Sequence, residues 1–100
     1  MNFLVQVDFP YIGPFGEEMS GAMRPLAEDI ATEPGLIWKI WTESESEKMA
    51  GGIYLFDNEA DARRYLEKHT ARLSGFGISG IRSLIFATND PLSRIDRAPL

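Results

Sequence analysis

The chain has 100 residues, a formal net charge of −5 and no cysteine. This length fits one domain, the acidic charge disfavours nucleic-acid recognition, and the missing thiols exclude disulfides, thiolate catalysis and thiolate metal sites. No apolar run approaches the roughly 20 residues that span a membrane, so we expect one cytoplasmic domain over residues 1–100 without a membrane partner.

The first third of the chain predicts a strand followed by a helix. Apolar and polar residues alternate over residues 3–9, which is typical of a strand, and Pro10 ends it. From Gly16 to about Thr32, apolar side chains recur at helical spacing behind two acids in the first turn. Because a proline inside a helix removes a backbone donor, Pro25 predicts a kink or a split near Met23–Arg24.

The remainder predicts a hairpin, a second helix, a fourth strand and a tail. In the second strand, Trp38 and Trp41 fall on opposite faces, and Lys39 shares the face of Trp41. Asp57-Asn58 are expected to cap the second helix. The expected bounds are residues 36–43 and 49–56 for the hairpin strands, 59–73 for the helix, 78–88 for the last strand and 89–100 for a tail with little periodicity.

The order β-α-β-β-α-β predicts an α+β, ferredoxin-like fold, in which a four-stranded antiparallel sheet has both helices on one face. The other face also carries apolar groups, among them Leu4 and one of the two tryptophans. Because a chain of this length buries only a modest core, we expect a second copy to cover that face. The prediction is a homodimer, with residues 89–100 as an arm across the interface.

His69 is the candidate catalytic residue. It is the only histidine, and it lies on the apolar stripe of the predicted second helix, facing the sheet. There it can donate a hydrogen bond to a ligand or accept a proton from it; a packed histidine bonded to a backbone carbonyl is the alternative. One histidine without cysteines does not make a ligand cluster, so we expect no metal site.

Aromatic and basic residues around His69 are candidates for binding a flat substrate. Only one of Trp38 and Trp41 can share its pocket, because residues three apart on a strand face opposite ways. The tyrosine hydroxyls need a partner when buried, either a ligand oxygen or a backbone carbonyl. The candidate substrate-binding residues are Trp38, Trp41, Tyr54, Tyr65 and Arg72, the last placed to attract an anion at the pocket mouth.

Five segments spread over nearly the whole chain carry a family resemblance. They are PFGEEM (residues 14–19), EPGLIWKIWTESE (33–45), GGIYLF (51–56), YLEKHTARL (65–73) and NDPLS (89–93). These segments resemble the YdhR family of small bacterial proteins, which are described as monooxygenases. The resemblance implies a dimeric α/β barrel related to the antibiotic biosynthesis monooxygenases.

The resemblance also implies an activity, namely oxygenation of a small aromatic or quinol-like compound by O₂ without a cofactor. Such chemistry needs a dry pocket, a proton acceptor and donors for the substrate anion. His69 and one of the tryptophans match family motif positions, and Tyr54 and Arg72 lie within the motifs. A dimer that binds or senses a small aromatic without turnover is the alternative. Haem-degrading relatives carry an asparagine on the first strand, where this chain has Gln6, which disfavours a haem role.

Overall fold

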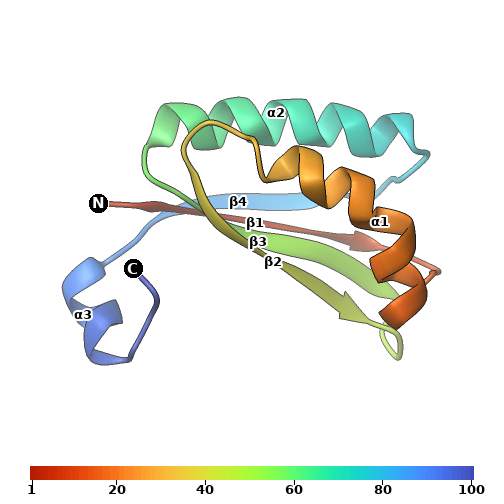
Figure 1. The fold of residues 1–100 in the computed structure, drawn as a ribbon, viewed down its shortest axis with the longest axis horizontal. Helices are drawn as coiled ribbons and strands as arrows, with labels where there is room; N and C mark the ends of the chain where they lie inside the picture. Colours follow the sequence, from red (N-terminus) through yellow and green to blue (C-terminus); the bar gives the residue numbers. More distant parts are fainter.

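The computed structural model describes residues 1–100, which form four strands and three helices (Figure 1). The first six elements follow the predicted β-α-β-β-α-β order, and the ferredoxin-like prediction is confirmed. The elements are β1 (Phe3–Pro10), α1 (Gly16–Ile30), β2 (Leu36–Ser44), β3 (Met49–Phe56), α2 (Glu59–Gly75), β4 (Arg82–Ala87) and α3 (Asp90–Ile95).

The strands form one antiparallel sheet in the spatial order β2-β3-β1-β4, and α1 and α2 cover the same face of it (Figure 1). Two interleaved β-α-β crossovers produce this order, because each helix returns the chain to the sheet from one side. Trp41 pairs with Gly52 and Lys39 with Tyr54 across the β2–β3 ladder. A bulge between Leu36 and Trp38 interrupts the β2 register ahead of these pairs.

Helix α1 is continuous despite the proline in its interior. We expected a kink or a split near Met23–Arg24, but the helix runs unbroken from Gly16 to Ile30, so no split occurs. Pro25 and Gly21, four residues before it, are both exposed. The carbonyl that Pro25 leaves without a helical partner therefore faces water, which can supply the missing hydrogen bond.

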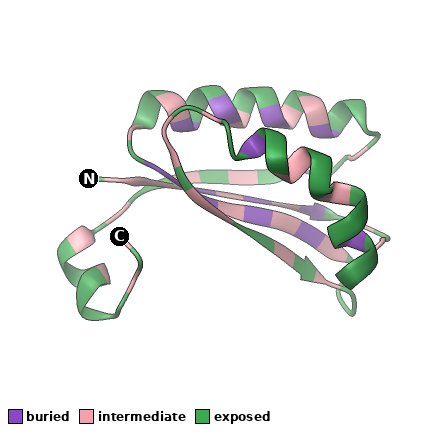
Figure 2. Ribbon diagram, in the orientation of Figure 1, coloured by how far each residue is buried: buried purple, intermediate pink, exposed green.

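Helix α2 follows its predicted pattern closely. The side chain of Asn58 accepts a hydrogen bond from the backbone N–H of Asp61, which confirms the predicted cap. The side chains on its inner stripe are buried against the sheet (Figure 2). This stripe consists of Ala62, Tyr65, His69 and Leu73. The helix therefore places the only histidine of the chain between itself and the sheet.

The C-terminal quarter differs from the prediction in two ways. Strand β4 begins at Arg82 rather than residue 78, because the backbone N–H of Ile78 bonds to Leu73 and still belongs to the end of α2. Residues 90–95 of the tail form helix α3, which begins at the Asn89 cap with a proline in its first turn. Six residues with a cap and a proline are too few for apolar periodicity to reveal a helix.

The core lies between the sheet and the two long helices, where the buried residues concentrate (Figure 2). The opposite face of the sheet carries large apolar side chains that remain half exposed, namely Ile40, Leu84 and Phe86. None of the helices combines the length and the apolar character needed to cross a membrane.

Candidate functional site

A small cavity lies between the sheet and the two long helices. Its volume is about 50 Å³, and 11 of its 13 lining residues are hydrophobic, so it would present a dry environment to a bound group. His69 of α2, Tyr54 of β3 and Trp41 of β2 lie in its wall. The space is enough for a water molecule or two and too small for an aromatic ring, so a substrate must enlarge it.

A wider groove of about 320 Å³ lies beside the cavity, between α1 and β2. The two spaces share three wall residues, Met19, Met23 and Trp41. Methionine side chains are flexible, so rotation of the two methionines is the simplest way to join cavity and groove. The joined space is of the size that binds small molecules in proteins.

The structure separates the two tryptophans in the manner that strand alternation predicts. Trp41 faces the helices and lines both cavity and groove. Trp38 lies on the opposite face, where its indole N–H donates a hydrogen bond to the carbonyl of Pro99 at 3.1 Å. The pocket tryptophan is therefore Trp41, and Trp38 holds the C-terminal tail.

His69 is buried, with 3% of its surface exposed, and it belongs to a chain of polar contacts. A guanidinium nitrogen of Arg72 lies 3.0 Å from its Nδ1, and the other one lies 2.9 Å from a carboxylate oxygen of Asp29 in α1. An arginine only donates hydrogen bonds, so Nδ1 must be the acceptor. The neutral ring consequently carries its proton on Nε2.

The surroundings of His69 keep it neutral. Burial, followed by the positive charges of Lys39 and Arg72, lowers the pKa of His69 to about 3. At neutral pH the imidazole is therefore a hydrogen-bond donor through Nε2. A proton acceptor with so low a pKa would be a weak base, which favours the first of the two roles considered for this residue.

Tyr54 and Tyr65 form an aromatic cluster with His69. The ring of Tyr65 stacks on the imidazole at 5.1 Å between centroids, and the ring of Tyr54 lies edge-on to it at 5.9 Å. Burial raises the pKa of Tyr54 and raises that of Tyr65 to about 12, so both phenols stay protonated. Tyr54 lines the cavity, whereas Tyr65 lies outside its wall and fixes the orientation of the imidazole.

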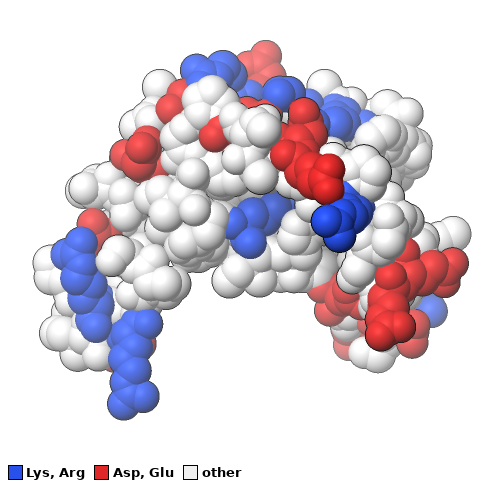
Figure 3. Space-filling model, in the orientation of Figure 1, with Lys and Arg blue, Asp and Glu red and all other residues white.

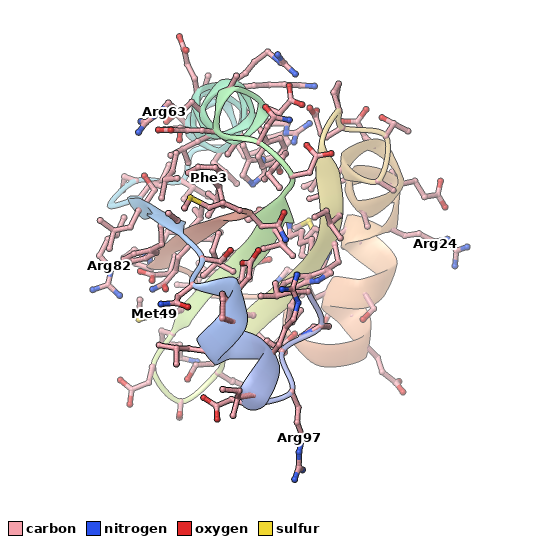
Figure 4. All side chains as sticks on the ribbon, turned by 90° about the vertical axis from the view of Figure 1, so that its left-hand side faces the viewer. Phe3, Arg24, Met49, Arg63, Arg82 and Arg97 are labelled. Atoms are coloured by element: carbon pink, nitrogen blue, oxygen red, sulfur yellow. The ribbon has the colours of Figure 1, made fainter.

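Arg72 lies beside the cavity, in the wall of a second, open groove that shares Met23, Leu26 and Phe76 with the cavity wall. Its guanidinium is bound to Asp29 and His69, and it does not line the small cavity. It orients the histidine and links α2 to α1. Arg63 points outward from α2 (Figure 4) and lines neither the cavity nor the groove between α1 and β2, whereas Arg24 of α1 lies in the wall of that groove.

Lys39 is a site residue that the sequence-based candidate set lacked. Its ammonium nitrogen lies 3.4 Å from the centroid of the Trp41 ring and 4.6 Å from that of Tyr54. Burial, followed by the nearby charge of Arg72, lowers the pKa of Lys39 to about 7. The alternation that puts Lys39 on the face of Trp41 was readable in the sequence, but a lone lysine on a strand carries no signal of its own.

No group of three or more histidine, cysteine, aspartate or glutamate side chains is arranged to hold a metal ion. The remaining chemistry of the site belongs to one neutral imidazole, two phenols, an indole and an amine. These groups can bind and orient a flat molecule that carries an ionisable oxygen.

When the sequence is compared with known protein families, one family matches nearly the whole chain. The model of the family described as "Putative mono-oxygenase ydhR" matches residues 4–99. No curated protein matches the chain. The matched range contains every residue of the cavity wall, so the family match and the cavity concern the same part of the molecule.

Proposed function

The chain belongs to the ydhR family, and we propose that it is a mono-oxygenase that acts on a small aromatic or quinol-like compound without a bound cofactor. The observation that carries this proposal is the apolar cavity walled by Trp41, Tyr54 and the neutral His69. An apolar cavity with a few converging polar groups is the usual form of a small-molecule site.

The reaction proposed draws its electrons from the substrate itself. A phenol or enol gives up its O–H proton, and the electron-rich anion reduces O₂. One oxygen atom enters the substrate and the other leaves as water. The protein contributes a dry pocket that replaces the hydration of the anion with fixed donors.

His69 has the role of a donor in this scheme. Its Nε2–H, oriented by Arg72 at Nδ1 and by the stacked ring of Tyr65, hydrogen-bonds the substrate oxygen on which charge develops. Tyr54 offers a second neutral donor in the cavity wall, because its raised pKa keeps the phenol protonated. Trp41 supplies the flat surface on which the substrate ring stacks.

Oxygen uptake by the purified, metal-stripped protein tests this proposal directly. The panel consists of hydroquinones and anthrone-like phenols, and binding is followed in the same samples through tryptophan fluorescence. We expect uptake that falls at least about tenfold in His69→Leu, whose side chain has no donor, since loss of a donor to a developing oxyanion costs about 10²-fold or more. Trp38→Phe is the matched control, because Trp38 lies on the other face of the sheet.

The outcomes separate the candidate functions. Full uptake in His69→Leu would show that a donor at position 69 takes no part in the reaction. Binding of the panel compounds without any uptake would contradict the mono-oxygenase proposal and assign the cavity to a protein that binds or senses a small aromatic compound.

A homodimer is the second part of the proposal. Ile40, Leu84 and Phe86 leave 53%, 52% and 45% of their surfaces exposed on one face of the sheet. A second copy placed sheet against sheet would cover them, with residues 89–100 reaching across. Figure 1 shows α3 and the tail standing away from the helical layer, at one end of the sheet.

Sedimentation measures the oligomeric state. We expect a dimer for the unmodified protein and a monomer for Phe86→Glu, because a charge at the centre of an apolar interface is not compensated. Ile12→Glu is the matched control, since Ile12 is 91% exposed on a loop outside that face. A dimer that survives Phe86→Glu would contradict the sheet-to-sheet arrangement.

A further inference from the structure

Seven of the ten lysine and arginine side chains have a carboxylate partner within 4 Å, which leaves three without one. Two of these three, Lys48 and Arg97, are exposed on a turn and in the tail. Only Lys39 is partly buried, and its nearest neighbours are aromatic rings. Burying an ammonium beside an apolar cavity without a counter-ion costs free energy, unless another group, such as a bound anion, compensates its charge.

The strand opposite Lys39 leaves space for its side chain. A Cβ added at Gly52 would lie 2.8 Å from Cε of Lys39, so the stem of the lysine fills the volume where another residue would have a side chain. This space allows the ammonium to lie against Trp41 and Tyr54 instead of extending into solvent. On the side of the molecule shown in Figure 3, basic side chains reach the surface near the centre, between α1 and β2.

Lys39 adjoins the cavity without lining it. Both rings that it contacts are wall residues, so a rotation of the four-carbon stem carries the amine from the ring face to the cavity. A flat substrate that stacks on Trp41 would displace the ammonium from that ring toward the edge of the substrate, where an acidic oxygen would lie.

We propose that Lys39 accepts the O–H proton of an acidic phenol or enol in this cavity and then holds the resulting anion, an inference that rests on the function proposed above. In this step the substrate O–H bond breaks, an N–H bond forms on the amine, and the bonding electron pair stays on oxygen. No oxidant takes part. The substrate class is therefore restricted to compounds with an ionisable hydroxyl on or next to the ring system.

The electrostatic surroundings fit this division of roles. The titratable and charged groups around Lys39 are Tyr54 from β3, His69 and Arg72 from α2, and, through Arg72, Asp29 from α1. The phenol of Tyr54 and the imidazole of His69 are both neutral at pH 7, and Asp29 forms an ion pair with Arg72. Lys39, with its pKa lowered to about 7, is the member of this group that exchanges a proton near neutral pH.

The test uses 4-nitrophenol, whose phenolate absorbs visible light while its phenol does not, so that binding and ionisation are read without turnover. We expect the intact protein to bind the phenolate at least about tenfold more tightly than the phenol, which lowers the pKa of the bound probe by about one unit. Lys39→Gln should reduce that preference to less than about threefold. Lys48→Gln is the matched control, because Lys48 also lacks a carboxylate partner but is exposed on the turn between β2 and β3.

Lys39→Arg separates holding the anion from accepting the proton. Arginine stays charged at all accessible pH values, so this variant should keep the preference for phenolate and lose at least about tenfold in oxygen uptake at neutral pH. In the unmodified protein, uptake should rise with pH near 7 as Lys39 loses its proton, and this rise should be absent in Lys39→Arg. Full uptake in Lys39→Arg would overturn the role of proton acceptor.

Gly52→Ala gives an independent check that removes no charge. Its Cβ must displace the lysine stem and also lies 3.1 Å from the ring of Tyr54, on which the ammonium rests, so we expect it to weaken the preference for phenolate. A preference for phenolate that survives Lys39→Gln would overturn the inference even if uptake occurs. A preference that depends on Lys39 in a protein without any uptake would instead contradict the mono-oxygenase proposal and leave the anion site standing.

Discussion

The two faces of the sheet are made by the same four strands but differ in how far their side chains are exposed to solvent. On the helix side, Val5, Tyr54 and Phe56 are at most 1% exposed, whereas Leu84 and Phe86 on the other side are about half exposed. Strand alternation distributes apolar residues to both faces and does not say which face will be covered. On the helix side the cover comes from α1 and α2, because both crossovers return on that side. On the other face Leu55, which pairs with Trp38, is also fully buried, so that face is open only in part.

The same difference governs the charged residues. Asp8 and Arg82 on the open face form a two-point ion pair of 3.0 and 2.9 Å at the surface, of the kind that contributes little to stability. Lys39 and His69 on the helix side have no carboxylate partner, and burial lowers the pKa of each. Burial thus turns ordinary residue types into groups with altered chemistry on one face only.

Matched truncations on the two faces give the largest predicted contrast. Phe56→Ala should cost about 3–5 kcal/mol in the free energy of unfolding, because it empties a fully buried volume. Phe86→Ala should cost about 1 kcal/mol or less in the monomer, since the ring is 45% exposed there. Urea unfolding at low protein concentration measures both, and equal costs would show that the open face is covered within one chain.

Adjacent glycines in β3 sharpen the contrast at the level of the backbone. On the open face, a Cβ at Gly51 would lie 1.9 Å from the carbonyl oxygen of Val7, so Gly51→Ala must distort the β1–β3 pairing and should cost about 2–3 kcal/mol. On the helix face, a Cβ at Gly52 would lie 2.8 Å from the movable stem of Lys39 and 3.1 Å from the Tyr54 ring but meets no backbone, so Gly52→Ala should cost about 1–2 kcal/mol. Thermal unfolding of the two variants checks the order, and the reverse order would contradict the contact assignments.

Acidification tests the buried histidine. The pKa of His69 is about 3 in the folded protein and 6.5 in its ordinary state, so the unfolded chain binds the extra proton between these values. Stability should therefore fall as the pH drops below about 6.5, by up to about 1.4 kcal/mol per pH unit. His69→Gln should lack this component in urea titrations at several pH values, and identical slopes in both proteins would contradict a buried neutral imidazole.

The smallest predicted effect concerns the tail on the open face. Trp38→Phe removes the indole donor to Pro99 and should cost about 1 kcal/mol or less, while releasing the last residues to carboxypeptidase digestion. Trp41→Phe should leave the tail protected, because its indole lies on the other face. Equal digestion of both variants would mean that the hydrogen bond does not hold the tail.

The fold was largely predictable because its signals are local. Alternation in residues 3–9, the cap at Asn58 and the inner stripe of α2 each follow from a few neighbouring residues, and the structure contains them all. Short α3 and the late start of β4 were missed, because six helical residues and a linker at residues 78–81 carry too little periodicity. The unbroken helix at Pro25 depends on exposure to water, which is a property of the folded surface.

By itself, the sequence determined the element order, the opposite facing of Trp38 and Trp41, and the inward position of His69, because these depend on the periods of strand and helix. Tertiary structure alone decided that Arg72 binds Asp29 and His69, and that the amine of Lys39 lies against two aromatic rings. Proton positions and pKa values depend on distances between residues far apart in the chain and on the exclusion of water, which exist only once the helices have packed on the sheet.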